Sequence, residues 1–188
     1  MAKKRLILAS ASPRRARILE TLGLFFRVVP SDLDESLLPW EAPDAAVRRL
    51  ARAKVMVPAR GPEDCVLAAD TMVVLGAKIL NKPKDAADAQ RMLRSLSGRA
   101  HTVMTGVAVA WGPKVATIVD RTEVRFRRMD ASEIERYVRS GEPMDKAGAY
   151  HIDGAGAAFI ESIEGSPSNV AGLSVTSARK LLKRAGVL

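Results

Sequence analysis

The chain has 188 residues, of which 30 are Lys or Arg and 21 are Asp or Glu, so its formal net charge is +9 at pH 7. A hydrophobic content of 47% is typical of a globular protein, and the length predicts a single domain over residues 1–188. With one cysteine and two histidines, the sequence excludes an intrachain disulfide, a cysteine-based zinc site and a histidine-rich metal centre. No apolar run reaches the ~18 residues that a membrane span needs, so we expect a cytoplasmic protein without a membrane partner.

The positive charge is concentrated towards the start of the chain. Residues 1–60 hold 12 Lys or Arg against 6 Asp or Glu, whereas residues 131–188 hold 7 of each. Such an excess suits a polyanion, either a nucleic acid, an acidic surface or a phosphorylated small molecule, but a solvated basic surface explains it more simply. Aromatic residues make up only 4% of the chain, which leaves few side chains to stack on bases, so we expect no nucleic-acid partner.

Strand and helix signals alternate along the chain. The first half is predicted to contain a strand at 6–9, a helix from Pro13 that Gly23 ends, a strand at 25–29, an acidic loop at 32–39, a helix at 43–57 and strands at 66–75 and 78–80. The second half is predicted to contain a helix from Asp85 to 96, strands at 101–111 and 115–127, a helix from Asp130 to 138, a strand at 157–163 and a helix at 175–185. These strand–helix units, with a hairpin turn at 112–113, indicate an α/β (mixed α+β) fold in which helices flank a mixed sheet.

Residues 10–15 (SASPRR) follow the first strand and open the first helix, with Ser12 as its expected N-cap. Free N–H groups and the positive end of the helix dipole make such a turn an anion site, and the forks of Arg14 and Arg15 match phosphate oxygens. A surface helix start with two solvated arginines explains the same residues equally well. Local chemistry therefore leaves both interpretations open.

Asp70 and Thr71 interrupt an otherwise apolar strand, which reads AADTMVV over residues 68–74. A carboxylate in a buried strand is costly unless it is paired, hydrogen-bonded or metal-bound, which makes Asp70 a functional candidate. The structural alternative is an Asp at a bulge or strand end that caps nearby amides. The apolar residues on both sides favour function.

Three further charged positions carry a weaker signal. Lys82 lies in a rigid loop and Lys54 ends a helix rich in arginine, and both positions are typical of a solvated surface. Glu35 lies in an acidic loop, where acids are usually solvated, although a hard divalent cation prefers oxygen ligands of this kind. Small residues at 142–150 and 165–170 either let the backbone approach a ligand or form tight turns.

Several segments follow one another in a recognisable order. They are LILASASPRR at 6–15, AADT at 68–71, KP at 82–83, MLRSLSG at 92–98, EPMDKAGAY at 142–150, and GS, NV and GL within 165–173. In this order they resemble the Maf family of nucleoside triphosphate pyrophosphatases. The matching segments span nearly the whole chain, and together they are a far stronger signal than any one alone.

The resemblance implies a Maf/ITPase-like fold, with an elongated mixed sheet flanked by helices and two lobes around a substrate cleft, commonly as a homodimer. It implies hydrolysis of a nucleoside triphosphate to the monophosphate and pyrophosphate with a divalent cation, Mg²⁺ or Mn²⁺. The segments SPRR at 12–15, ADT at 69–71 and DKAGAY at 145–150 look like the subgroup that prefers dTTP and UTP. The alternatives are the subgroup that prefers 7-methyl-GTP, a nucleic-acid-binding module and a regulator of cell division.

The same resemblance implies roles for individual residues. Asp70 is the expected proton acceptor, and Arg14, Thr71 and Asp153 are expected to influence base selection. We expect the triphosphate to bind among Ser10, Arg14, Arg15, Lys54 and Lys82, and the metal ion to be held by Glu35, Asp70 and the substrate phosphates.

Asp153 and His151 are among the residues that depart from the subgroup's pattern. Asp153 stands where the subgroup usually has Gln, and His151 replaces a usual small residue. A Gln amide offers both a donor and an acceptor to a pyrimidine edge, whereas an ionised Asp only accepts. Uracil and thymine can still donate their N3–H to Asp153, but one partner for a base carbonyl is lost.

Overall fold

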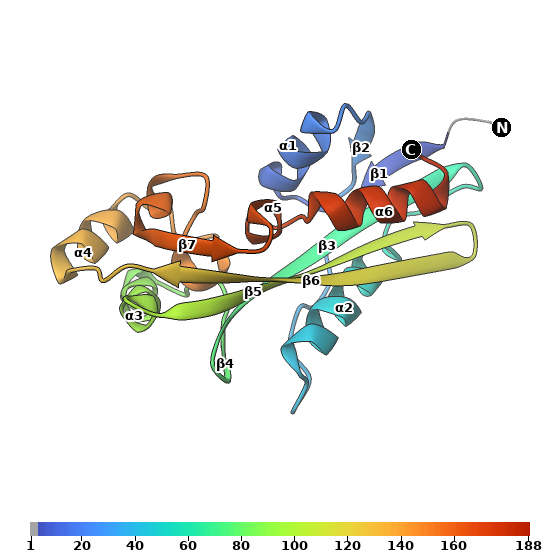
Figure 1. Ribbon diagram of the computed structural model, residues 1–188. Coiled ribbons are helices and arrows are strands. Elements are labelled where there is room, and N and C mark those ends of the chain that lie inside the picture. The colour runs from blue at the N-terminus through green and yellow to red at the C-terminus, as the bar shows by residue number, and fades with distance from the viewer. Residues whose placement is uncertain (1–3) are drawn as a thin grey trace. The chain divides into compact units, whose positions relative to one another are not determined.

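The computed structural model describes residues 4–188, in which seven strands form one mixed sheet (Figure 1). The strands pair in the order β2-β1-β3-β5-β6-β7, and β4 pairs with β3. Their bounds are β1 Arg5–Leu8, β2 Phe26–Val28, β3 Asp64–Leu75, β4 Lys78–Leu80, β5 Ala100–Trp111, β6 Lys114–Phe126 and β7 Ile160–Glu164. Strand β1 is parallel to β2 and β3, whereas β4 is antiparallel to β3 and β7 is antiparallel to β6.

The helices largely occupy the predicted positions. They are α1 Pro13–Thr21, α2 Pro43–Lys54, α3 Ala86–Leu96, α4 Ala131–Arg139, α5 Pro167–Val170 and α6 Val175–Ala185, with 3₁₀ helices η1 Ala147–Ala149 and η2 Ala155–Phe159. Asp130 and Glu133 form the expected capping box at the start of α4. The predicted mixed α/β fold, with helices flanking the sheet, is confirmed.

Two element boundaries differ from the prediction by three residues. The strand predicted at 157–163 is wrong in its first three residues, which belong to η2. The apolar run there reflects Phe159, which is buried and packs edge-on against the Tyr137 ring, and not a strand alternation. Helix α2 ends at Lys54 and not at 57, because Pro58 disfavours helical backbone at the residue before it.

The chain divides into two compact units. Unit 1 comprises the chain through Asp70, Thr105–Asp120 and Gly172–Leu188, and unit 2 comprises Thr71–Met104 and Arg121–Ala171. Strands β3, β5 and β6 each contribute residues to both units. Two units agree with the two expected lobes, while a single domain over 1–188 and a cleft between the lobes stay predictions.

In unit 1, helices cover both faces of the sheet. Leu8 of β1 packs with Leu19 of α1 and Leu181 of α6, whereas its neighbour Ile7 packs with Ala51 of α2. Figure 1 shows α1 and α6 on one side of these strands and α2 on the other. The strands here are apolar on both faces, as expected for parallel strands that are covered on both sides.

Gly106 of β5 allows α2 to lie close to the sheet. A Cβ atom at this position would lie 2.4 Å from the carbonyl oxygen of Val47 in α2. That distance is shorter than any normal contact, so only glycine fits without moving the helix. The contact therefore sets the height of α2 above the strands of unit 1.

The core of unit 2 contains a cluster of aromatic side chains. The rings of His101, Phe126 and Tyr150 meet edge to face, with centroids 4.9–5.4 Å apart, and His101 Nε2 lies 3.0 Å from the Tyr150 hydroxyl oxygen. Burial lowers the pKa of His101 to about 4, so the imidazole is neutral at pH 7.

Within residues 4–188, no helix is both long and apolar enough to cross a membrane.

Candidate functional site

The chain changes direction across the sheet at the carboxyl end of β1. From β1 it runs through α1 to β2 on one side, and then through α2, on the opposite face, to β3 on the other side. In open α/β sheets, ligands bind at the carboxyl ends of the strands at such a switch point. β1 ends at Leu8, which pairs with Leu67, so β3 continues past β1 and carries Asp70 beyond its end.

Arg15 ties the start of α1 to the segment after β1. Its Nε donates to the carbonyl oxygen of Gly172 over 2.8 Å, and its Nη1 donates to Ser10 Oγ over 3.2 Å. Ser10 is buried, and its Oγ also accepts from the backbone N–H of Ser12 over 3.2 Å. Ser12 holds the expected N-cap position, but its side chain makes no capping hydrogen bond.

The ammonium group of Lys54 lies between two carboxylates. Its Nζ is 2.6 Å from Asp70 Oδ1 and 2.7 Å from Glu35 Oε1, so these two oxygens are at most about 5.3 Å apart. The side chains of Lys54 and Asp70 are 6% and 7% exposed, whereas that of Glu35 is 50% exposed. The costly carboxylate inside β3 is therefore stabilised by a buried ion pair.

Strand alternation brings Asp70 to Lys54. Val66 and Ala68 of β3 pack in the cluster that includes residues of α2. Because side chains two residues apart share a face of a strand, Asp70 lies on this same face of the sheet. It is the polar end of an apolar row that α2 covers.

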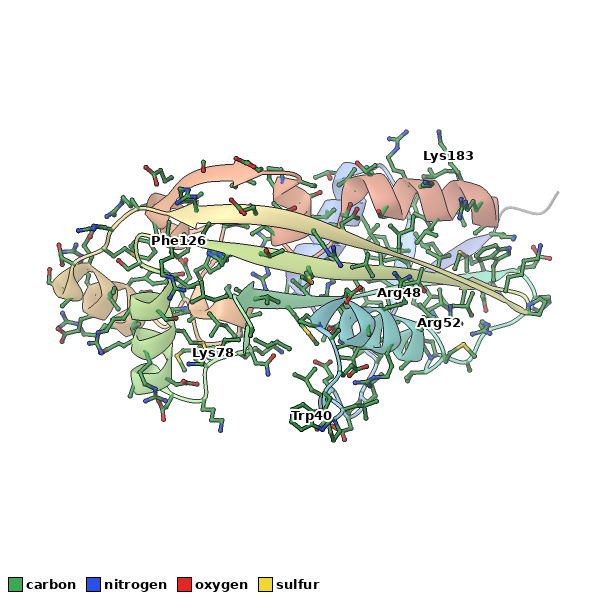
Figure 2. The ribbon with its side chains drawn as sticks, turned by 60° about the horizontal axis from the view of Figure 1, so that its bottom comes forward. Trp40, Arg48, Arg52, Lys78, Phe126 and Lys183 are labelled. Carbon is green, nitrogen blue, oxygen red and sulfur yellow. The ribbon has the colours of Figure 1, made fainter. Side chains whose placement is uncertain are left out.

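The helical period brings Lys54 to the same place. Leu50 of α2 is buried, and Lys54, four residues later, lies on the same side of the helix. Arg48 and Arg52 are exposed on the outer side of α2, as Figure 2 shows. They form the solvated basic surface that the sequence suggests, whereas Lys54 faces the sheet.

The charges around Asp70 favour an anion. Arg14 is half-buried in the first turn of α1. Burial is the main cause that lowers the pKa of Arg15, and the positive charge of Arg14 lowers it further. The negative charges of Asp70 and Glu35 act in the opposite direction and raise it. Three cationic groups therefore lie near two carboxylates, and the excess suits phosphate oxygens.

The two carboxylates also suit a hard cation. Glu35 and Asp70 supply the oxygen atoms that Mg²⁺ and Mn²⁺ prefer, and both reach the point that Lys54 Nζ occupies. In the part of the chain that the structure describes, no three or more His, Cys, Asp or Glu side chains gather as a metal site. The pair fits a cation that takes its remaining ligands from bound phosphate and water.

Arg49 holds the segment that carries Glu35, a role that the sequence does not reveal. Its Nε and Nη2 each donate to Glu41 over 2.7 Å, and Nη2 also donates to the carbonyl oxygen of Ser36 over 3.1 Å. Trp40, in the same segment, is fully exposed (Figure 2). No local pattern marks the Arg49–Glu41 pair, because it joins a helix to the irregular segment before it.

The remaining expected site residues lie in unit 2. Thr71 is half-buried in β3, next to Asp70, while Lys82 is exposed after β4 and Asp153 is exposed before η2. The structure thus links Ser10 with Arg15 and Lys54 with Asp70 and Glu35, and all of these, like Arg14, belong to unit 1. That Thr71, Lys82 and Asp153 complete the same site stays a prediction.

A pocket of about 700 Å³ lies elsewhere in unit 1, among residues that include Arg5, Phe25, Arg27 and Asp64. Arg5 begins β1 and Asp64 begins β3, so the pocket lies at the amino ends of these parallel strands. Ligands of open α/β sheets bind at the opposite, carboxyl ends. We therefore assign the site to the surroundings of Asp70 and not to this pocket.

The sequence matches the family of Maf-like proteins over residues 5–185, and the chain belongs to this family. It is 51% identical over 187 residues to the dTTP/UTP pyrophosphatase of Anaeromyxobacter dehalogenans strain 2CP-1, a match that covers 97% of this chain and 94% of that protein. It is also 51% identical over 183 residues to the dTTP/UTP pyrophosphatase of Myxococcus xanthus strain DK1622, covering 97% and 93%. Among solved structures, a dITP/XTP pyrophosphatase from Mycobacterium abscessus is 15% identical, with a TM-score of 0.45 over 66% of this chain and 75% of that one.

Proposed function

We propose that this chain hydrolyses dTTP and UTP to the nucleoside monophosphate and pyrophosphate. The observation that carries the proposal is the buried Asp70, which is paired with Lys54 at the switch point of the sheet and interacts electrostatically with Arg15 in the first turn of α1. Relatives that share about half of the sequence over nearly its full length are dTTP/UTP pyrophosphatases, which supports this substrate class.

Binding of the triphosphate depends on charge. Arg14, Arg15 and the amino end of α1 bind phosphate oxygens, with Ser10 as an added hydroxyl donor and Lys82 as a further cation. Lys54 exchanges part of its contact with Asp70 for a phosphate oxygen. The same buried ammonium group therefore pairs with Asp70 before the substrate binds and with a phosphate oxygen in the complex.

Asp70 then acts as the general base. It accepts a proton from a water molecule whose oxygen bonds to the α-phosphorus. The bond from that phosphorus to the bridging oxygen breaks, and pyrophosphate leaves with the electron pair. The cations around the phosphates offset the charge that develops during the transfer.

A divalent cation, Mg²⁺ or Mn²⁺, belongs to the same proposal. Glu35 and Asp70 would hold it together with the substrate phosphates. When bound, such an ion lowers the pKa of a coordinated water and offsets phosphate charge. Because Lys54 Nζ lies between both carboxylates, its movement towards the phosphates also releases them as ligands.

In this proposal, hydrogen bonds select the nucleobase of the substrate. Asp153 accepts the N3–H of uracil or thymine, and Arg14 and Thr71 contribute to the choice of base. A homodimeric, cytoplasmic enzyme without nucleic-acid or membrane partners completes the proposal.

A panel of nucleotides tests this function. The protein is incubated with UTP, dTTP, CTP, GTP and 7-methyl-GTP in the presence of Mg²⁺ or Mn²⁺, and pyrophosphate and monophosphate are measured. We expect the fastest release from dTTP and UTP. Release from 7-methyl-GTP alone would assign the other subgroup, and no pyrophosphate from any nucleotide would overturn the proposal.

Two matched Asp→Asn variants test whether Asp70 is the general base. Asp70→Asn should lower the rate by roughly 10²–10⁴-fold. Asp64→Asn is the control, because Asp64 is also buried in β3 and also paired, with Arg5 Nε at 2.9 Å, but it begins the strand, six residues before Asp70. The control should retain the wild-type rate. Equal turnover of a folded Asp70→Asn variant would exclude Asp70 as the base.

A further inference from the structure

A single carboxylate binds the loop that runs from His151 to Gly156. Glu142 Oε2 accepts from the backbone N–H of Ala155 over 3.1 Å, and Glu142 Oε1 accepts from the backbone N–H of Gly156 over 3.1 Å. Glu142 Oε1 also accepts from the Tyr137 hydroxyl over 2.8 Å. The Tyr137 oxygen in turn accepts from the backbone N–H of His151 over 3.1 Å. These two side chains, the Glu142–Tyr137 clamp, hold both ends of the loop.

Two glycines allow the clamp to close. A Cβ atom on Gly154 would lie 2.6 Å from Glu142 Oε1, and one on Gly156 would lie 2.7 Å from the Tyr137 hydroxyl oxygen. A Cβ atom at either position would displace the loop or the clamp side chain that it meets. The close approach of the backbone therefore serves these two side chains.

Glu142 holds the loop as an ionised acceptor. Burial alone would raise its pKa, but the hydrogen bonds from Gly156, Tyr137 and Ala155, with the nearby charge of His151, outweigh burial and lower it. Hydrogen bonds to a charged acceptor are roughly twice as strong as those between neutral groups. Several such bonds on one carboxylate make the loop a preformed element.

Asp153 lies on this clamped loop with its side chain 59% exposed, whereas the side chain of His151 is 16% exposed. His151 Nε2 lies 4.0 Å from Asp153 Oδ2, within the range of an ion pair when the imidazole is protonated. With the backbone held on both sides of it, the main chain of Asp153 has a fixed position, which limits the space that its carboxylate can reach. An acceptor that is confined to this space, at an exposed position, is suited to recognising one donor on a ligand.

We propose that Glu142 and Tyr137 are positioning residues for base selection, and that they act by fixing Asp153. The inference rests on the proposed function, in which Asp153 accepts the N3–H of the base. Uracil carries a hydrogen at N3, whereas cytosine presents a lone pair there, which repels a carboxylate. Discrimination against CTP then depends on the clamp, because a mobile carboxylate can turn away from the wrong base.

The test compares UTP with CTP in clamp variants. Glu142→Gln weakens the acceptor and Tyr137→Phe removes one hydroxyl, and both keep the shape of the side chain. Each should raise the KM for UTP and lower the ratio of kcat/KM for UTP over CTP roughly tenfold, as expected for the loss of a hydrogen bond to a charged group. The kcat for UTP should change less than about twofold, because in this inference the clamp acts on recognition of the nucleobase and not on the phosphoryl transfer itself. Glu135→Gln, an exposed carboxylate on the same helix as Tyr137, should leave all these values unchanged.

The Asp153→Ala background separates positioning from general structural support. If the clamp acts through Asp153, adding Glu142→Gln or Tyr137→Phe to Asp153→Ala should not change the UTP/CTP ratio further. An equal fall in kcat for both nucleotides, or a further loss of selectivity without Asp153, would overturn the inference. A wild type that hydrolyses UTP but whose clamp variants keep its selectivity would refute the inference alone. A wild type that releases no pyrophosphate from UTP would refute the proposed function and the inference with it.

Discussion

The Lys54–Asp70 ion pair has a consequence for stability that can be measured. At 2.6 Å and an effective dielectric constant of ~20, the Coulomb attraction is about 6 kcal/mol, and desolvation of the two charges offsets a large part of it. Removing one partner of a buried pair costs about 3–5 kcal/mol, because the other charge stays buried without compensation. The two single variants should differ, since Glu35 also contacts Lys54.

Lys54→Met leaves Asp70 buried without its ammonium partner, so we expect the free energy of unfolding to fall by about 3–5 kcal/mol. Asp70→Asn leaves Lys54 paired with Glu35 at 2.7 Å, so we expect a smaller loss, about 1–3 kcal/mol. In the double variant no buried charge is left behind, and its loss should be smaller than the sum of the single losses by at least about 1 kcal/mol. Glu35→Gln is the control; its side chain is half-exposed, so it should cost less than about 1 kcal/mol.

Urea unfolding at pH 7, followed by circular dichroism, gives the free energy of unfolding for each variant. The expected order of loss is Lys54→Met above Asp70→Asn above Glu35→Gln. If the two single losses add within about 0.5 kcal/mol, the two side chains do not interact in solution. A larger loss for Asp70→Asn than for Lys54→Met would show that Glu35 does not share Lys54.

Three further predictions concern other buried residues. Burial lowers the pKa of His101 to about 4, so below pH ~6.5 the unfolded chain binds a proton on this imidazole more readily than the folded chain does. The free energy of unfolding should therefore fall by about 2 kcal/mol from pH 7 to pH 5. Urea unfolding of His101→Phe should not show this part of the pH dependence. Gly106→Ala should lower the free energy of unfolding by at least about 2 kcal/mol through its clash with Val47, and an unchanged thermal midpoint would contradict this. Burial raises the pKa of Cys65 to about 12, so a disulfide reagent should modify this thiol only after unfolding, and rapid reaction of the native protein would be the opposing result.

The secondary structure and Asp70 could be predicted because their signals are local. Apolar alternation and helix boundaries depend on neighbouring residues, so the predicted elements match β1, β3, α3 and α6 closely. A carboxylate inside an apolar strand needs a partner whatever the rest of the fold is, so Asp70 could be singled out without a structure. The local pattern could not say which residue supplies that partner.

Long-range packing decides the rest of the site. Lys54 is 16 residues away from Asp70 in sequence, and it reaches the carboxylate because α2 lies against the sheet where Gly106 permits close approach. A lysine at the end of an arginine-rich helix is typical of a solvated surface, and only the packing of α2 distinguishes Lys54 from Arg52. The Glu142–Tyr137 clamp could not be predicted from the sequence for the same reason, since the Glu142 carboxylate accepts from backbone N–H groups 13 and 14 residues away.

The charge of the site extends the argument to the proposed metal ion. Arg14, Arg15 and Lys54 exceed Asp70 and Glu35 by one positive charge, and Lys82 would add another. A nucleoside triphosphate brings about four negative charges, so the complex would have a net charge of about −2, which one divalent cation neutralises. We therefore expect EDTA to abolish pyrophosphate release from UTP, and excess Mg²⁺ or Mn²⁺ to restore it where Na⁺ does not. Undiminished turnover in EDTA would show that the cationic side chains of the protein are sufficient, and would remove the metal ion from the proposal.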